Sequence, residues 1–242
     1  MFKLLVILFL SGFMSSTLAT ISKITVVTGE WPPYTSQTVT GYGLTASTMI
    51  HALSSQGVSV EFKWLPWKRA FLEAKEAKYD GTIPWFKTPG REKEFYFSLP
   101  IGFSDTVIWY SKSNPVYFSN LSDLTGKRLG GTIGYSYGEK FDLASKDKFT
   151  YDLARSDLIN LKKLLIGRID AFPCDKEVCK DLIENFLTRE EASKLTFATA
   201  SLVSIPTYFL VSKKHKNAKE ILYRVNEGLK LINKSKAMDS TF

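Results

Sequence analysis

The stretch ISKITVVTGEWPPYTSQT, residues 21–38, decides how the chain begins to fold. Its β-branched residues favour a strand from about residue 23 to residue 28. That strand must end before Pro32, because each proline fixes φ and lacks the N–H group that a sheet ladder needs. Two large aromatics, Trp31 and Tyr34, therefore leave the end of a strand on a stiff loop. Such side chains usually stabilise a protein by being buried, so their position needs a further explanation.

Strand-like and helix-like segments alternate along the rest of the chain. We expect further strands at 58–65, 106–112, 127–133, 169–172 and on both sides of Pro206. We expect helices at 44–56, 66–78, 176–187 and 217–232, a short helix from about 121, one opened by SYGEKFDLA and one ending near Gly167. Alternating β and α elements predict an α/β fold with parallel sheets covered by helices.

Two such βα cycles are separated by the polar segment SKSNP, residues 111–115. We therefore expect a first lobe made of residues 23–109 and 207–242, a second lobe made of residues 113–203, and two hinge crossings between them. Ligands of such sheets bind at the carboxyl ends of the strands. The EWPPY loop occupies such an end, which predicts that Trp31 contacts a ligand.

The first residues, MFKLLVILFLSGFMSSTLA, have the features of a secretory signal. Lys3 precedes an apolar run, and the small residues Thr17 and Ala19 are spaced as a cleavage site needs. The apolar run is too short to cross about 30 Å of hydrocarbon as a helix, so a membrane anchor is the weaker alternative. We expect cleavage after Ala19 and a periplasmic location.

Composition and charge exclude two classes of protein. Hydrophobic residues make up 44% of the 242 residues, which excludes a disordered chain. The formal net charge is +8, but the basic residues are spread along the sequence, whereas nucleic-acid binders gather them on one face or arm. The one short cluster, KKHKNAK at 213–219, is best interpreted as solvated surface. We expect no nucleic acid among the partners.

The chain has two cysteines, Cys174 and Cys179, in the run PCDKEVCKD. An oxidising compartment and the short separation predict an intramolecular disulfide. At least one of the pair must then lie outside a helix, because residues five apart on one helix do not face each other. A metal site would want more ligands nearby, and the two histidines, His51 and His215, are far away in sequence. We expect no metal and no cofactor.

Three further residues follow predicted strands. Trp67 comes after VSVEFKWL, Arg91 after DGTIPWFKTPG, and Asp175 ends GRIDAFPCD. Together with Trp31 they suit a small zwitterion, because rings can cover apolar parts, a guanidinium can grip a carboxylate, and an Asp can accept from an ammonium.

Each of these residues also has a purely structural interpretation. The tryptophans can fill the edges of a core. Arg91 can be a surface residue that pairs with Glu92 or Glu94, an arrangement that contributes little to stability. Asp175 can cap the helix that follows it. Singly, none of these residues is a specific signal.

The order of these features resembles family 3 of the extracellular solute-binding proteins, the periplasmic receptors for polar amino acids that serve ABC importers. The resemblance covers nearly the whole mature chain. It is carried by TGEWPPY, LPWKRAFLEAKEAKYDGTI, TPGREKEFYFSLPI, LSDLTGKRLGGTIGYSYGEKF and LLIGRIDAFPCDKE. It implies the two-lobe type II periplasmic-binding-protein fold, with a ligand held between the lobes.

The resemblance also implies contacts with the ligand. Trp31 and Trp67 correspond to aromatics that stack around it, Arg91 to the arginine that grips its α-carboxylate, and Asp175 to the acid that takes its α-ammonium. The loop at 134–136 corresponds to one that adds hydroxyl and N–H donors at a helix start. The full set of expected ligand-binding residues is Trp31, Trp67, Trp85, Thr88, Arg91, Gly134, Ser136 and Asp175.

The sequence departs from the family in two places. Amino-acid receptors usually have a Ser and Thr cluster before the arginine, but this chain has IPWFK at 83–87, and only Thr88 can supply a hydroxyl. After Gly41 and Tyr42, the usual acidic residue is replaced by GLTAS. We therefore expect a more aromatic cleft, and a ligand that is aromatic, apolar or not an amino acid at all.

The leading hypothesis is a monomeric binding module that closes around one small solute and presents it to an ABC permease. One alternative is an enzyme on the same scaffold, similar to cyclohexadienyl dehydratases. An enzyme needs a general acid or base near its substrate; Glu30 and Asp175 are available, but no catalytic pair stands out. The other alternative is a sensor whose closed form docks onto a membrane-bound receptor. We expect binding without catalysis.

Overall fold

The computed structural model describes residues 21–133, 135, 137, 139–144 and 148–239. The predicted signal peptide therefore lies outside the described residues, as do Gly134 and Ser136. The strands are β1 Lys23–Thr28, β2 Ser59–Trp64, β3 Gly81–Phe86, β4 Phe95–Ser111, β5 Arg128–Thr132, β6 Thr150–Ala154, β7 Phe172–Asp175 and β8 Leu195–Ser212. The helices are α1 Leu44–Ser54, α2 Trp67–Lys75, α3 Pro89–Glu94, α4 Glu139–Ala144, α5 Asp157–Leu165, α6 Lys176–Phe186, α7 Arg189–Ser193 and α8 Ala218–Asp239, with 3₁₀ turns η1 Thr40–Tyr42 and η2 Leu121–Leu124.

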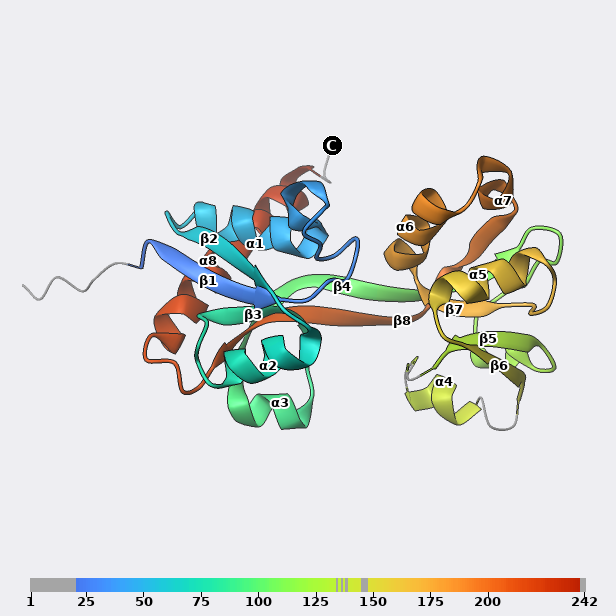
Figure 1. Ribbon diagram of the computed structural model, residues 1–242, viewed down its shortest axis with the longest axis horizontal. Coiled ribbons are helices and arrows are strands. Elements are labelled where there is room, and N and C mark those ends of the chain that lie inside the picture. Colours follow the sequence, from blue (N-terminus) through green and yellow to red (C-terminus); the bar gives the residue numbers. More distant parts are fainter. Residues whose placement is uncertain (1–20, 134, 136, 138, 145–147, 240–242) are drawn as a thin grey trace, which may run out of the picture.

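The strands and helices form two bodies connected by the long strands β4 and β8 (Figure 1). Six strands form one mixed sheet in the order β2-β1-β3-β8-β4-β7, and β5 pairs with β6 separately. The strand β1 is parallel to β2 and β3, whereas β8 is antiparallel to β3 and β4. The α/β class is confirmed, but the sheet is mixed because β8 returns from the second body in the opposite direction.

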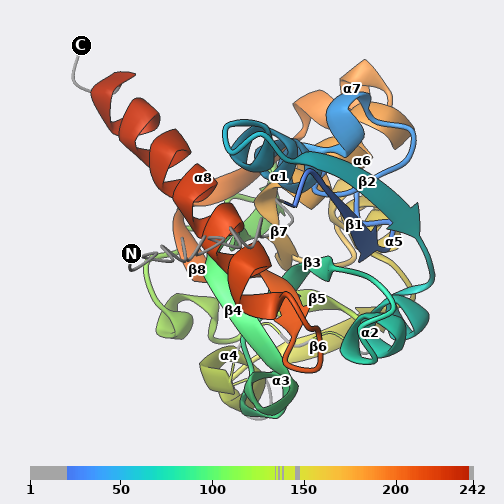
Figure 2. The ribbon, with the colours of Figure 1, turned by 90° about the vertical axis from the view of Figure 1, so that its left-hand side faces the viewer.

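Helices cover both faces of the first body's sheet. Ile24 and Val26 of β1 pack in one core with side chains of α1 and α8, whereas Val27 packs on the opposite face with Ala70 and Ala74 of α2. This division follows from the alternation of side chains along a strand. Figure 2 shows α8 lying across the first body in front of β4 and β8.

The second body begins within β4 itself. Val107 and Trp109 pack in one core with Leu161 of α5, while Ile108 packs in another with Leu129 of β5. The sequence analysis ends the first segment of the first lobe at residue 109 and begins the second lobe at residue 113. In the structure, residues 107–109 already pack in the cores of the second body. The division of the chain into two lobes that move as units stays a prediction.

Both connecting strands run through a proline, Pro100 in β4 and Pro206 in β8. Pro206 lies within β8 and pairs in register with Phe103. The neighbouring strand β3 pairs with β8 only as far as Thr207, so at Pro206 one side of β8 is open and the missing N–H group is tolerated. In β4, the register shifts on both sides of Pro100. As a result, β8 is one long strand where two were expected, and β4 begins well before the strand expected at 106–112.

The predicted disulfide is present. It joins Cys174 in β7 to Cys179 in α6, with a Cα–Cα distance of 6.3 Å, so one partner lies outside the helix as the geometry requires. In the described part of the chain, no group of three or more potential metal ligands occurs. Among the same residues, no helix has the length and apolarity needed to cross a membrane.

Candidate ligand-binding site

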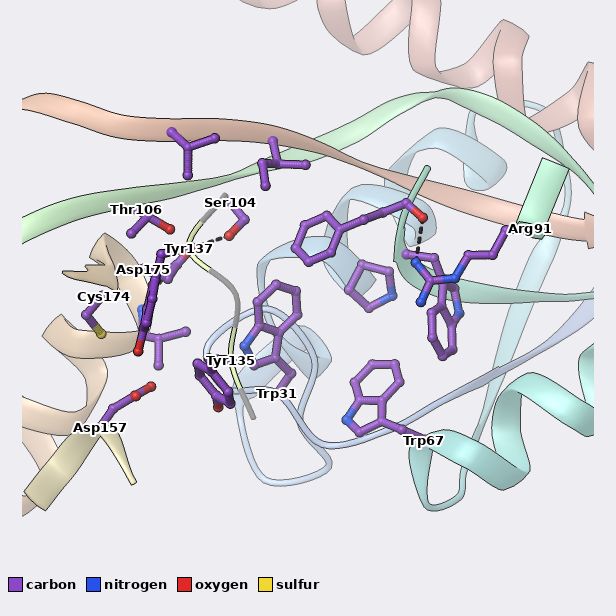
Figure 3. A pocket seen from close by; sticks show the side chains of 16 residues that line it. Trp31, Trp67, Arg91, Ser104, Thr106, Tyr135, Tyr137, Asp157, Cys174 and Asp175 are labelled. Carbon is purple, nitrogen blue, oxygen red and sulfur yellow. Dashed lines mark hydrogen bonds between the residues drawn. The ribbon is translucent and has the colours of Figure 1, made fainter. Parts of the chain in front are cut away.

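A cavity of about 500 Å³ lies between the two bodies (Figure 3). This volume is in the range of small-molecule sites. The first body and the connecting strands contribute Trp31, Trp67, Pro84, Trp85, Phe86, Arg91, Ser104, Thr106, Val203 and Ile205; the second body contributes Tyr135, Tyr137, Asp157, Cys174, Asp175 and Val178. Residues at or just after the ends of six strands, β1, β2, β3, β5, β6 and β7, therefore face one space.

The wall from the first body is aromatic. Trp31 follows β1, and its ring centroid lies 4.5 Å from that of Tyr34 and 6.1 Å from that of Phe86. Trp67 begins α2 and meets Trp85 of β3 nearly edge to face, with the centroids 5.2 Å apart. These ring contacts hold the three tryptophans in place beside the cavity. That they contact a ligand stays a prediction.

Arg91 of α3 lies on this aromatic wall. Its Nη1 donates to the carbonyl oxygen of Phe86 at 2.6 Å, and its Cζ atom lies 4.7 Å from the centroid of the Trp85 ring and 5.8 Å from that of Phe71. Burial lowers the pKa of the guanidinium. Its remaining N–H groups are donors for an anion in the cavity.

The alternative interpretation of Arg91, pairing with a neighbouring glutamate, is wrong. Glu92 instead pairs with Lys87 at 2.9 Å, and Glu94 pairs with Lys75 at 2.9 Å. Neither carboxylate is therefore the partner of the guanidinium.

Two predicted polar contacts have other roles or lie outside the described residues. Thr88 is the N-cap of α3, where its Oγ1 accepts from the backbone N–H of Arg91, and it does not line the cavity. Gly134 and Ser136 are not described, but their neighbours Tyr135 and Tyr137 line the cavity. Burial raises the pKa of Tyr137 to about 12, so its hydroxyl stays neutral.

Asp175 lines the cavity from the second body and is also the N-cap of α6. Its carboxylate accepts from the hydroxyls of Tyr34 and Ser104 and from the backbone N–H groups of Glu177 and Val178. Burial raises the pKa of this carboxyl, and the hydrogen bonds oppose that rise. The capping interpretation is thus confirmed, and the contact from Tyr34 joins the two bodies directly.

Three polar residues at the site were not predicted from the sequence. Ser104 and Thr106 lie in the middle of β4. The sequence predicted no carboxyl end of a strand there, and it is at carboxyl ends that ligand contacts were expected. Asp157 begins α5, and its Oδ1 accepts from the hydroxyl of Thr132. The sequence predicted where this helix ends, near Gly167, but not where it begins. Asp157 was therefore not recognised as a residue that follows a strand.

Comparison with known proteins identifies the family. Residues 24–242 match the bacterial extracellular solute-binding proteins, family 3. The chain belongs to this family. Among curated proteins, the L-cystine-binding protein TcyJ of Escherichia coli (strain K12) is 26% identical over 163 residues. That match covers 64% of this chain and 59% of TcyJ, so less than two thirds of the relative is spanned.

Solved structures of similar fold cover nearly all of this family 3 chain. The second substrate-binding domain of a putative amino acid ABC transporter from Streptococcus pneumoniae superposes with a TM-score of 0.73 and 19% identity, covering 90% of this chain and 96% of that one. The second substrate-binding domain of GlnP from Lactococcus lactis, in an open conformation, gives 0.70 and 19%, covering 90% and 93%. At these identities the likeness establishes the fold.

Proposed function

We propose that the chain is a periplasmic solute-binding protein that captures an amino acid, or a related small carboxylate, between its two bodies. The observation that carries this proposal is the distribution of charge around one aromatic cavity. Arg91 faces it from the first body, and Asp157 and Asp175 face it from the second (Figure 3). A zwitterion bound there would contact both bodies.

Contacts from both bodies are what ligand-driven closure requires. A ligand shifts an open–closed equilibrium only as far as it binds the closed form better. Closure about β4 and β8 would bring Arg91 and the acidic wall, formed by Asp157 and Asp175, into contact with the same small molecule. The closed form would then be presented to an ABC permease. The names of the similar proteins, which bind cystine or belong to amino acid transporters, support this reading.

Binding without catalysis is supported by the state of Glu30 and Asp175, the two acids that the sequence offers as catalytic groups. Asp175 is occupied by four donors. Glu30 accepts from the backbone and side chain of Gln37 and does not line the cavity. We therefore propose that a bound solute is released unchanged, and that the protein acts as a monomer.

Calorimetry on the mature protein tests this function. The panel consists of the twenty common L-amino acids and L-cystine, and we expect at least one of them to bind. A ligand at about 100 times its Kd should add about 2.7 kcal/mol to the free energy of unfolding, which a thermal-shift screen detects first. Mass spectrometry of the recovered solute should show no product. Binding of none of the panel would refute the amino-acid proposal, and turnover would establish an enzyme.

A further inference from the structure

Two carboxylates face the cavity from the second body, and their surroundings differ. Asp157 is the first residue of α5, and Asp175 directly precedes α6. Figure 3 shows both on the side of the cavity opposite Arg91, with Trp31 between. A cationic group of a bound solute could pair with either, so the number of donors that each already accepts decides between them.

The acceptor positions of Asp175 are filled. Its Oδ2 accepts from Ser104 at 2.7 Å and from Tyr34 at 2.9 Å. Its Oδ1 accepts from the N–H groups of Glu177 and Val178, both at 3.0 Å, and shares the Tyr34 hydroxyl at 2.9 Å. A carboxylate has about four lone-pair positions. An incoming ammonium would have to displace one of these donors.

The acceptor positions of Asp157 are largely free. Among the described residues, one side-chain donor reaches it, the hydroxyl of Thr132 on Oδ1. That hydroxyl oxygen in turn accepts from Asn160 Nδ2 at 3.2 Å, which fixes its orientation toward the carboxylate. No lysine or arginine of the described chain forms an ion pair with Asp157. Burial and the nearby charge of Asp175 raise its pKa, as expected for a carboxylate with little hydration and no cation.

The charges around the cavity favour a cation at this position. Among the described lining residues, Arg91 carries the positive charge, and Asp157 and Asp175 carry two negative charges. A solute carboxylate at Arg91 leaves the acidic wall without a counter-charge. A buried charge is costly unless it is paired, so a solute cation beside Asp157 removes an existing penalty.

We propose that Asp157, and not Asp175, binds the cationic group of the solute, while Tyr34 and Ser104 keep Asp175 as a structural acceptor. This inference rests on the proposed function. It defines the ligand class as an amino acid with a free ammonium or guanidinium group that reaches Asp157. Amino acids whose only amine is acylated, and solutes with only anionic groups, should bind more weakly, because they have no cation to pair with Asp157.

Two isosteric variants separate the roles of the two acids. Calorimetry compares Asp157→Asn with Asp175→Asn, using whichever of the twenty L-amino acids and L-cystine binds the parent protein. We expect Asp157→Asn to weaken binding about 30-fold or more, because the cation loses its charged partner. We expect Asp175→Asn to weaken binding at least tenfold less than Asp157→Asn does, because the Asn oxygen can still cap α6 and no direct contact with the solute cation is lost.

A second readout distinguishes contact with the cation from a structural effect. The parent protein should prefer the amino acid over its N-acetyl derivative or, if a basic side chain reaches Asp157, over the neutral analogue of that side chain. In Asp157→Asn this preference should shrink by about tenfold or more. Asp157→Ser serves as a further variant if Asp157→Asn does not fold, since Ser is also tolerated at a helix start.

The outcomes separate this inference from the proposed function. Binding by the parent with a large loss in Asp175→Asn, or with equal losses in both variants, would overturn the role of Asp157 and leave solute binding intact. An unchanged preference for the free amine in Asp157→Asn would do the same. Failure of the parent to bind any of the panel would overturn the amino-acid proposal itself, and this inference with it.

Discussion

Arg91 is held so that both its charge and its shape are available to a ligand. Its guanidinium stacks against Trp85 with Cζ 4.7 Å from the ring centroid. A planar guanidinium can grip a carboxylate with two parallel N–H···O bonds, which lysine cannot reproduce. We expect Arg91→Lys and Arg91→Ala each to reduce the free energy of binding by about 2 to 5 kcal/mol, measured by calorimetry with a panel ligand.

Lys87 supplies the matched control for this prediction. It is a nearby cation of the same body, but it pairs with Glu92 and does not line the cavity. Lys87→Ala should leave the affinity unchanged. If both Arg91 variants also bind as the parent does, Arg91 has no part in the site, and the case for a ligand carboxylate loses its main support.

Asp157 should make the unliganded protein less stable at neutral pH. Its pKa is raised in the folded state, so the folded protein holds this proton more tightly than the unfolded chain does. As pH rises through the unfolded and then the folded pKa, the unfolded chain ionises first and the free energy of unfolding falls. Asp157→Asn should therefore raise the melting temperature at pH 7 and have little effect at pH 3. Equal melting temperatures at pH 7 would contradict the desolvation of Asp157.

Trp31 and Trp67 should report ligand binding by their fluorescence. Both line the cavity, and solute contact would change the surroundings of their rings. The chain has five tryptophans, so Trp31→Phe and Trp67→Phe are compared one at a time, with Trp109→Phe as the buried control. We expect each cavity replacement to reduce the ligand-induced change. A change of full size in both variants would remove the aromatic wall from the site.

Among the elements, β7 and α6 are joined by the Cys174–Cys179 disulfide beside the acidic wall. A short covalent loop restricts the unfolded chain only modestly. Replacing both cysteines by serine should lower the free energy of unfolding by about 2 kcal/mol, as urea denaturation would measure, while circular dichroism shows the same fold. Loss of the folded state would mean that the bridge is essential for the second body rather than supportive.

The sequence predicted the elements whose pattern is local. The strands β1, β2 and β5 and the helices α1, α2 and α6 lie within a few residues of their expected positions. It did not predict that β8 is one long strand, because Pro206 looks like a break, and of β4 it predicted only the last part, at 106–112. Whether a proline breaks a strand depends on which neighbour lies beside it, and that is a property of the folded sheet.

The candidate site was predictable to the extent that its residues follow strands. Trp31, Trp67, Arg91 and Asp175 were placed at the cavity because the carboxyl ends of strands converge there. The hydrogen bond from Tyr34 to Asp175 was not predictable, since it joins residues from two bodies and depends on their relative position. The same holds for Asp157, whose importance appears only once the acceptors of Asp175 are counted.

At the scale of the whole molecule, the two bodies should approach each other when a ligand binds. They are connected by β4 and β8 (Figure 1), and residues of both bodies line the cavity. Small-angle X-ray scattering should show a smaller radius of gyration with a panel ligand than without it. The Arg91→Ala variant, which should bind weakly, should show no such change at the same ligand concentration. Binding without compaction would contradict closure.

The order of the strands also constrains how the first body is assembled as the chain is synthesised. The sheet of the first body has β8 next to β3, and β8 comes from near the end of the sequence. A chain that emerges from its N-terminus therefore presents β1, β2 and β3 with an unpaired edge until residue 212 has arrived. The second body is continuous in sequence, so it can form earlier. The exposed edge of β3 is therefore the segment of the first body that is most open to pairing with another chain before β8 is made.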